Sequence, residues 1–354
     1  MNQNEWERLS RTVRRENVKT EVALIVDSPW IPGYFGQGIV DFYSRPDLWI
    51  QDYRRIKEDF PEAILIPDYW VEFGMATEPS GFGCRVEFFQ DNLPIVHHLF
   101  DSIDDFEPDR LKLPNPRTSG LAPIALSMQS DVQTKIREQG DELYIVSTRG
   151  PLTLASHLLA LTELLVGVKI EPEKIHSLLQ VTTDYCISWL TAQMENVKTA
   201  KAILVLDDVT GFLGEDDYLE FAHPYLKKIF DAFPETMHLF HNDTDSDICF
   251  PHVRDLGVDI FNFTHKKDIA AARQKISGNV CLMGNVPPMS LAKESPDAVR
   301  EHTTDVIRSY CRGNGGSAAG LLLSPGGGVP MGATHDNVAA MIDAVKSYNA
   351  EIVL

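Results

Sequence analysis

Cysteine is scarce in this chain, and basic residues are outnumbered. The five cysteines among 354 residues show no Cys-x-x-Cys spacing, so neither a disulfide framework nor a zinc knuckle is indicated. The 32 basic residues stand against 51 acidic residues, which gives a formal net charge of -19. A surface of that sign repels polyanions. The sequence therefore argues against nucleic-acid binding and predicts a reducing, cytoplasmic location.

Long apolar runs are missing as well. Residues 1–18 are polar and charged, without the apolar segment of a signal peptide. No uninterrupted apolar run reaches the roughly 18 residues that a membrane-spanning helix needs. We therefore expect neither secretion nor membrane insertion. The content of 44% hydrophobic and 23% charged residues is instead typical of a globular protein with a large core.

The chain does contain a repeated alternation of short β-branched runs and longer amphipathic stretches. Repeated β-then-α order predicts right-handed crossovers and a parallel sheet, and eight such units close as a (β/α)8 TIM barrel. An open doubly wound sheet is the alternative. The predicted strands are Val22–Asp27, Ala63–Pro67, Leu143–Ser147, Ile203–Asp207, Met237–His241, Val258–Phe261, Val280–Gly284 and Leu321–Ser324, and the predicted helices are 158–167, 171–195, 215–232, 268–275, 296–312 and 337–347.

These elements predict one domain over residues 1–354. Residues 1–20 contain an N-terminal helix, which we expect to be exposed because apolar residues are sparse between 4 and 16. Residues 75–123 are rich in Pro, Gly and Asp. This insertion is too long for an ordinary barrel loop, so we predict that it forms a cap near the active-site face.

Polar residues follow the predicted strands, where the loops of a barrel build its active site. His241 and Asp243 are two positions apart, so their side chains point to one face and can bind zinc or another divalent ion. Alternatively, Asp243 caps the next helix. Asp207 and Asp208 end an apolar strand, and the inward-pointing one can bind a cation or act as a base. Pairing with a basic residue is the other interpretation.

Further residues complete the predicted site. Asp68 is expected to serve as acid, base or anchor, and Glu72 and Glu78 as additional metal ligands at the same rim. The glycines of 324–328 expose backbone N–H groups that bind phosphate or carboxylate, or else they form a turn. Aromatic side chains suit a flat or methylated ligand. The predicted substrate-binding residues are Trp30, Tyr34, Tyr69, Arg149, His157, Asn285, Gly327 and Gly328.

Two segments carry a family resemblance. Residues 150–157, GPLTLASH, resemble the G-P-x-T-L-A segment of the uroporphyrinogen decarboxylase superfamily, and residues 218–227, YLEFAHPYLK, resemble its F-x-E-F-x-x-P-Y-x-K segment. Residues 284–286 and 324–328 fit later family positions, so the resemblance runs from about 22 to 348. It implies a barrel with one of two chemistries. These are cofactor-free decarboxylation of uroporphyrinogen, in porphyrin biosynthesis, and corrinoid-linked methyl transfer by zinc enzymes.

The chain departs from the decarboxylases that it resembles. Asp68 falls at their pyrrole-binding aspartate, but residues 28–34 replace their arginine-rich motif. Their Tyr, Ser and His positions fall at His157, at Asp208 and near 327–328. A substrate rich in carboxylates needs arginines, and Arg149 is the only arginine at a predicted strand end.

The chain also departs from the methyltransferases of the superfamily. They carry His-x-Cys where this sequence has His241-Asn242-Asp243, and a further cysteine where its last loop has glycine. Loss of both thiolates leaves a harder site of His, Asp and Glu ligands.

These comparisons lead to one preferred function and two alternatives. We expect a methyltransferase-like enzyme, which can form a homodimer, that moves a methyl group between a small methylated substrate and a corrinoid carried by a partner protein. The first alternative is uroporphyrinogen decarboxylase or a related decarboxylase without a cofactor. The second is a ligand-binding barrel without catalysis.

Overall fold

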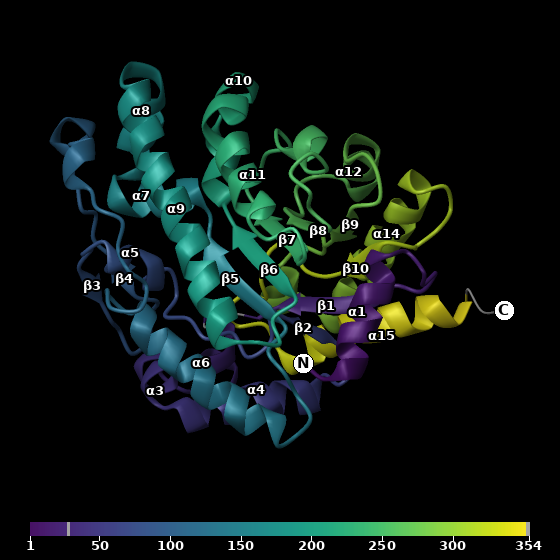
Figure 1. Ribbon diagram of the computed structural model, residues 1–354. Coiled ribbons are helices and arrows are strands. Elements are labelled where there is room, and N and C mark those ends of the chain that lie inside the picture. Colours follow the sequence, from purple (N-terminus) through teal and green to yellow (C-terminus); the bar gives the residue numbers. More distant parts are fainter. Residues whose placement is uncertain (27–28, 352–354) are drawn as a thin grey trace.

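A computed structural model describes residues 1–26 and 29–351, and its centre is a sheet of eight parallel strands (Figure 1). The sheet order is β2-β1-β10-β9-β8-β7-β6-β5. This confirms the (β/α)8 barrel and all eight predicted strands, each within two residues of its predicted ends. Asp27 and Ser28 lie outside the described residues. The strands are β1 (Glu21–Ile25), β2 (Ile64–Ile66), β5 (Ile145–Arg149), β6 (Ala202–Leu206), β7 (Met237–Asn242), β8 (Ile260–Phe263), β9 (Cys281–Met283) and β10 (Leu321–Leu323).

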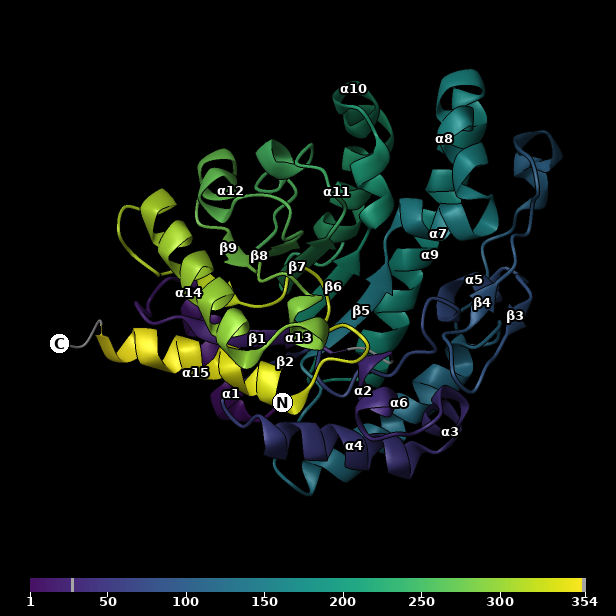
Figure 2. The same ribbon diagram turned by 180° about the vertical axis from the view of Figure 1, so that it is seen from behind.

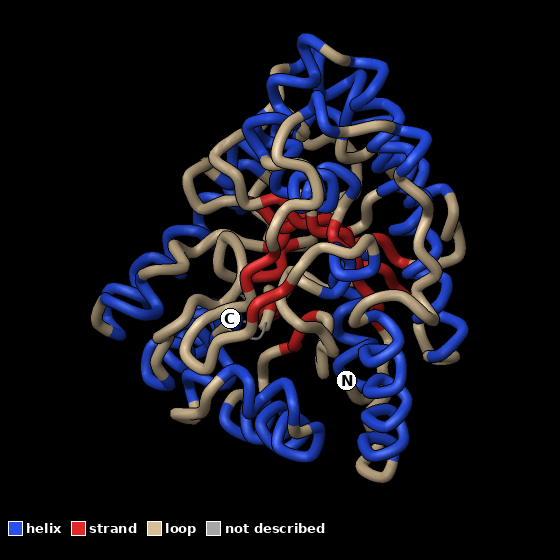
Figure 3. The backbone as a smooth tube through the Cα atoms, turned by 90° about the vertical axis from the view of Figure 1, so that its left-hand side faces the viewer, coloured by secondary structure: helices blue, strands red, loops and turns tan. Residues whose placement is uncertain are grey.

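Helices surround the strands on all sides (Figures 2 and 3). In the chain as described, no helix is both long and apolar enough to span a bilayer. Helices α4 and α6 were not among the predicted ones. The helices are α1 (Gln3–Val13), α2 (Trp30–Tyr34), α3 (Ile39–Ser44), α4 (Pro46–Asp59), α5 (Thr77–Gly81), α6 (Ala122–Arg137), α7 (Pro151–Leu158), α8 (Leu161–Ile170), α9 (Pro172–Asn196), α10 (Glu215–Asp217), α11 (His223–Asp231), α12 (Ile269–Lys275), α13 (Ser290–Lys293), α14 (Pro296–Gly313) and α15 (His335–Glu351), with shorter turns η1 (Ile103–Asp105), η2 (Pro108–Arg110), η3 (Asp208–Phe212), η4 (Tyr218–Ala222) and η5 (Phe250–His252).

The N-terminal helix α1 is present, but the expectation that it would be exposed was wrong. Asn2 and Glu5 form a capping box at its start, which satisfies two backbone N–H groups. Leu9 and Thr12 are both fully buried. Trp6 and Val13 are partly buried and pack against the same core, so a few apolar side chains are enough to turn this mostly polar helix toward the barrel.

The predicted insertion, residues 75–123, contains α5 and a small antiparallel hairpin of β3 (Val86–Glu87) and β4 (Ile95–Val96). The hairpin lies beside α5 in both ribbon views (Figures 1 and 2). Leu99 and Phe100 both donate backbone hydrogen bonds to the carbonyl of Leu158, so the insertion is attached to the end of α7. Its role as a cap stays a prediction.

The barrel has one seam, because β2 and β5 end the sheet and do not pair with each other in the described chain. Asp68 and Tyr69, just after β2, have φ values of 65° and 46°. These left-handed conformations are strained for residues other than glycine. They direct the chain toward the start of β5, where the Tyr69 hydroxyl donates to Asp141 at 3.1 Å. The following residues then run along the open edge of β5.

Side chains satisfy the open edge of β5. The backbone N–H of Arg149 donates to Glu78 at 2.9 Å, and the carbonyl of Ser147 accepts from Gln193 at 2.8 Å. Glu72 forms an ion pair with the Arg149 guanidinium at 2.7 Å. Buried backbone groups need such partners, so polar side chains close the barrel where strand pairing does not.

Candidate active site

A cavity of 160 Å³ opens at the carboxyl ends of the strands. Its walls come from the ends of β1, β5, β6 and β7 and from the loops after β2 and β10, which is where barrel enzymes hold their active sites. The lining residues are Ile25, Trp70, Met75, Arg149, Thr153, Leu206, Asp208, His241, Asp243 and Gly328.

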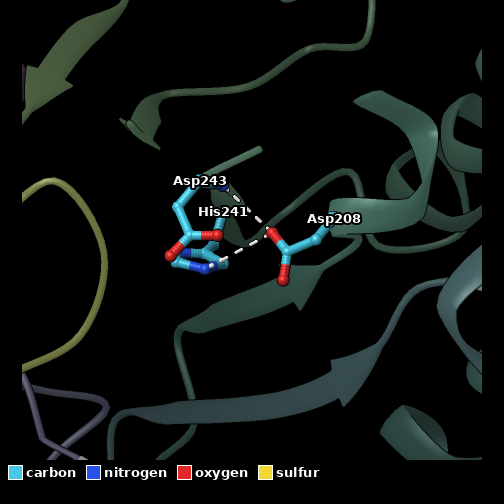
Figure 4. Close-up of side chains that lie close together, drawn as sticks. All are labelled: Asp208, His241 and Asp243. Atoms are coloured by element: carbon cyan, nitrogen blue, oxygen red, sulfur yellow. Dashed lines mark hydrogen bonds and ion pairs between the residues drawn. The ribbon is translucent and has the colours of Figure 1, made fainter. Parts of the chain in front are cut away.

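Three of these residues form a compact cluster. Asp208, His241 and Asp243 each offer one ligand atom, and these atoms lie within 4.8 Å of one another (Figure 4). The Nε2 atom of His241 is 3.6 Å from Asp208 Oδ1, which also accepts the backbone N–H of Asp243 at 3.0 Å. Among the residues that the structure describes, this is the only His, Cys, Asp and Glu group with such spacing. The predicted pair His241 and Asp243 is thus brought together, with Asp208 as third member.

The other ring nitrogen of His241 has a hydrogen-bond partner on the neighbouring strand β8. Nδ1 of His241 lies 2.7 Å from Oδ1 of Asn262, and the two residues are partners in the register of β7 and β8. An amide oxygen only accepts hydrogen bonds, so Nδ1 carries the ring proton. When the ring is neutral, its lone pair is therefore on Nε2, on the side of Asp208.

Asp243 completes the cluster at the rim. The residue as a whole is exposed, but desolvation of its carboxyl group and the charge of Asp208 raise the pKa of Asp243 against the lowering effect of His241. Gly327 leaves room for this carboxylate, because a Cβ atom there would lie 2.6 Å from Asp243 Oδ2. The glycine loop therefore contributes space to the cluster.

Asp207, which was predicted together with Asp208, does not line the cavity. Its buried carboxylate accepts the backbone N–H groups of Leu152 and Thr153, at 3.0 and 2.9 Å, and the Thr153 hydroxyl at 2.8 Å. It therefore holds the first turn of α7, where a negative charge is favourable. Burial raises the pKa of Asp207 to about 7, and these hydrogen bonds oppose that shift. A Cβ atom at Gly150 would lie 2.3 Å from this carboxylate.

Glu72 and Glu78, predicted as metal ligands, are placed elsewhere. Both are buried and bind Arg149, one at its guanidinium and the other at its backbone N–H. Arg149 does line the cavity, with its guanidinium 5.2 Å from the ring centre of Trp70. Both glutamates therefore belong to the seam, and neither lines the cavity. Arg149, which does line the cavity beside them, is already paired with the Glu72 carboxylate.

Asp68 and Tyr69 also lie outside the cavity. Asp68 is 3.0 Å from Lys57 Nζ and 2.5 Å from the ammonium group of Met1. Burial alone would raise the pKa of Asp68, but these two cations lower it. Lys57 also binds Glu5 and Asp141, each at 3.0 Å. The site role expected for Asp68 is therefore replaced by a buried ion cluster beside the seam.

The remaining predicted substrate-binding residues are dispersed. Trp30 is fully buried and donates to the carbonyl of Ala333, and Tyr34 donates to Asp59. Asn285 donates to backbone carbonyls of the 264–267 loop and lines a separate groove of 480 Å³ beside α14. His157 is partly buried, and desolvation together with Arg149 lowers its pKa to about 4. Of this set, Arg149 and Gly328 line the cavity, and Gly327 adjoins it.

Sequence reasoning missed Asn262 and Met75. A polar signal for Asn262 existed, because it interrupts the apolar run of β8, but its partner depends on the strand register. Met75 follows a mostly apolar segment, residues 69–74, and carries no such signal.

The fold is a parallel β/α barrel with a cavity at the carboxyl ends of its strands, where barrel enzymes hold their active sites. Sequence comparison identifies the family. The chain belongs to the uroporphyrinogen decarboxylase (URO-D) family, whose sequence model matches residues 61–348. A uroporphyrinogen decarboxylase from Xanthomonas campestris pv. campestris is 27% identical over 97% of this chain and 98% of its own length. The one from Chlorobaculum tepidum is 30% identical over 51% of each chain. A methyltransferase from Methanosarcina mazei shares the fold, with a TM-score of 0.79 at 18% identity, over 96% of this chain and 98% of its own.

Proposed function

We propose that this protein is a metal-dependent methyltransferase, which moves a methyl group between a small methylated donor and a corrinoid held by a partner protein. The observation that carries the proposal is that one ring nitrogen of His241 and one carboxylate oxygen each of Asp208 and Asp243 lie within 4.8 Å of one another. Electron pairs gathered this closely repel one another unless a cation lies among them. The cavity therefore suits a positively charged centre.

The donor set fits a divalent metal ion. One imidazole nitrogen and two carboxylate oxygens match the three protein ligands of a catalytic zinc site, and they also suit manganese or iron(II). Three ligands leave further positions open to a substrate. A bound divalent ion would supply Lewis-acid chemistry that stabilises negative charge on a leaving heteroatom.

The cavity walls support a small donor. The cavity volume of 160 Å³ is below the roughly 300–1,000 Å³ of pockets that hold drug-sized ligands. Trp70 and Met75 offer apolar contact for a methyl group. A corrinoid is far larger than this cavity, so it would be presented at the mouth by its carrier protein.

Decarboxylation of uroporphyrinogen has weaker support from these side chains. A substrate rich in carboxylates would meet Asp208 and Asp243, and the lining arginine, Arg149, is already paired with Glu72. Burying unpaired carboxylates beside like charges is costly. Because the sequence relatives are named uroporphyrinogen decarboxylases, the experiment below also measures this activity.

The test measures metal content and methyl transfer together. We expect stoichiometric divalent metal in the purified protein by plasma mass spectrometry. With cobalt(I) cobalamin and small O- or N-methylated donors, we expect the absorbance change of cobalamin methylation. Anaerobic conversion of uroporphyrinogen to coproporphyrinogen by metal-free protein would overturn the proposal in favour of the decarboxylase.

A further inference from the structure

Resting on the proposed metal site, we infer that Asn262 is a positioning residue that fixes the tautomer of His241 and thereby sets the affinity of the site for a metal. Asn262 lies on β8 and is almost fully buried. It does not line the cavity, and its contact with the cluster is the one with the His241 imidazole.

The orientation of the Asn262 amide follows from its other partners. Its Nδ2 group donates to the carbonyls of Met283 and Pro325, at 2.9 and 3.3 Å. Two carbonyl oxygens can face only the NH2 end of an amide, so the oxygen end must face His241. The backbones of β9 and the last glycine loop therefore determine which amide atom meets the imidazole ring.

This chain of contacts fixes the ring of His241. The 2.7 Å separation from Asn262 Oδ1 requires a proton on Nδ1, and a neutral imidazole then has no proton on Nε2. The register partnership of His241 and Asn262 holds the ring in place along two hydrogen-bonded strands. Without the amide acceptor, the tautomer with its proton on Nε2 would be favoured, because Asp208 Oδ1 lies 3.6 Å from that nitrogen. That tautomer cannot bind a metal through Nε2.

The experiment reads the tautomer and the metal affinity separately. Nitrogen NMR of the metal-free protein in alkaline solution, where histidine is neutral, reports which ring nitrogen of His241 carries the proton. Competition titration with zinc reports affinity. We expect the Nδ1–H tautomer in the wild type. In Asn262→Leu we expect its loss and a fall in zinc affinity of roughly 10- to 100-fold, which is typical of outer-shell partners.

Two variants keep the test decisive. Asn262→Asp keeps an acceptor oxygen against Nδ1, while its second oxygen faces the Met283 and Pro325 carbonyls, so we expect the Nδ1 proton to be kept at a cost in stability. Asn337→Leu removes another buried asparagine that donates to backbone carbonyls, on α15, and should leave both the tautomer and the zinc affinity unchanged. Wild-type affinity and tautomer in Asn262→Leu would overturn the inference. A wild type with the Nδ1–H tautomer that binds no divalent ion would support the tautomer and sink the metal proposal.

Discussion

Asp207 and Asp208 are adjacent in sequence, yet their carboxylates serve opposite sides of the same loop. Asp207 is buried against the first turn of α7 and accepts three hydrogen bonds there. Asp208 lies in the cavity, 3.6 Å from His241. One carboxylate therefore belongs to the scaffold and the other to the site, and the pair offers a matched comparison.

Replacing each aspartate by asparagine should separate stability from binding. In Asp207→Asn we expect the free energy of unfolding to fall by about 1–3 kcal/mol, because the helix loses a charged cap and a buried group loses partners. In Asp208→Asn we expect a zinc affinity at least about 10-fold lower, with stability changed by less than about 1 kcal/mol. Urea unfolding and zinc titration of both variants check this. Equal metal loss in the two variants would contradict the assignment.

Asp68 should contribute stability and not binding. Breaking a buried ion pair leaves an uncompensated charge, so Asp68→Asn is expected to cost about 3 kcal/mol. Its zinc affinity should match the wild type, since Lys57 and the Met1 ammonium group, not the cavity, surround this carboxylate. Denaturant titration measures the first effect. A stable Asp68→Asn protein that has lost activity would restore Asp68 to the site.

His157 should make the protein sensitive to acid. Its pKa is lowered to about 4 in the folded state, against about 6.5 for an unfolded chain. The unfolded state therefore binds more protons between these values, so stability is present above about pH 6.5 and is lost as the pH falls through about 4. Urea midpoints of His157→Gln should fall less steeply over this range than those of the wild type.

A histidine on another helix provides the control for this pH series. His335 has an exposed side chain at the start of α15, and His335→Gln should keep the wild-type slope. Parallel slopes for all three proteins would show that His157 is not the source.

Gly327 should be needed for the position of Asp243. An alanine Cβ would lie 2.6 Å from Asp243 Oδ2, at a φ of 135°, so Gly327→Ala should lower zinc affinity as well as stability. Gly315→Ala also has a positive φ, of 65°, but open space around its Cβ. It should lose only about 1 kcal/mol of stability through backbone strain. Calorimetry and zinc titration of both variants distinguish the two effects.

The fold could be predicted from the sequence because each barrel strand is a short apolar run followed by polar residues. The cluster was predicted in part, since residues two apart, such as His241 and Asp243, share a face. The sequence did not show which of Asp207 and Asp208 points into the cavity. The strand before them is apolar at every position and gives no alternating pattern to fix their direction.

Other site residues depended on geometry that sequence spacing does not contain. Asn262 meets His241 through the register of neighbouring strands. Asp68 follows β2 as the strand-end rule requires, but the positive φ values at Asp68 and Tyr69 carry it away from the barrel mouth. Met75 reaches the cavity from the insertion, whose course no periodicity determines.

At the seam between β2 and β5, side-chain contacts hold the barrel together in place of strand pairing. The Arg149 side chain takes part in the seam and also lines the cavity, while the strand pairings from β2 round to β5 are made by backbone groups. Side-chain substitutions at the seam can therefore widen or narrow the cavity without removing a strand pair. A scaffold of this kind allows ligand size to diverge among relatives while their overall architecture stays the same.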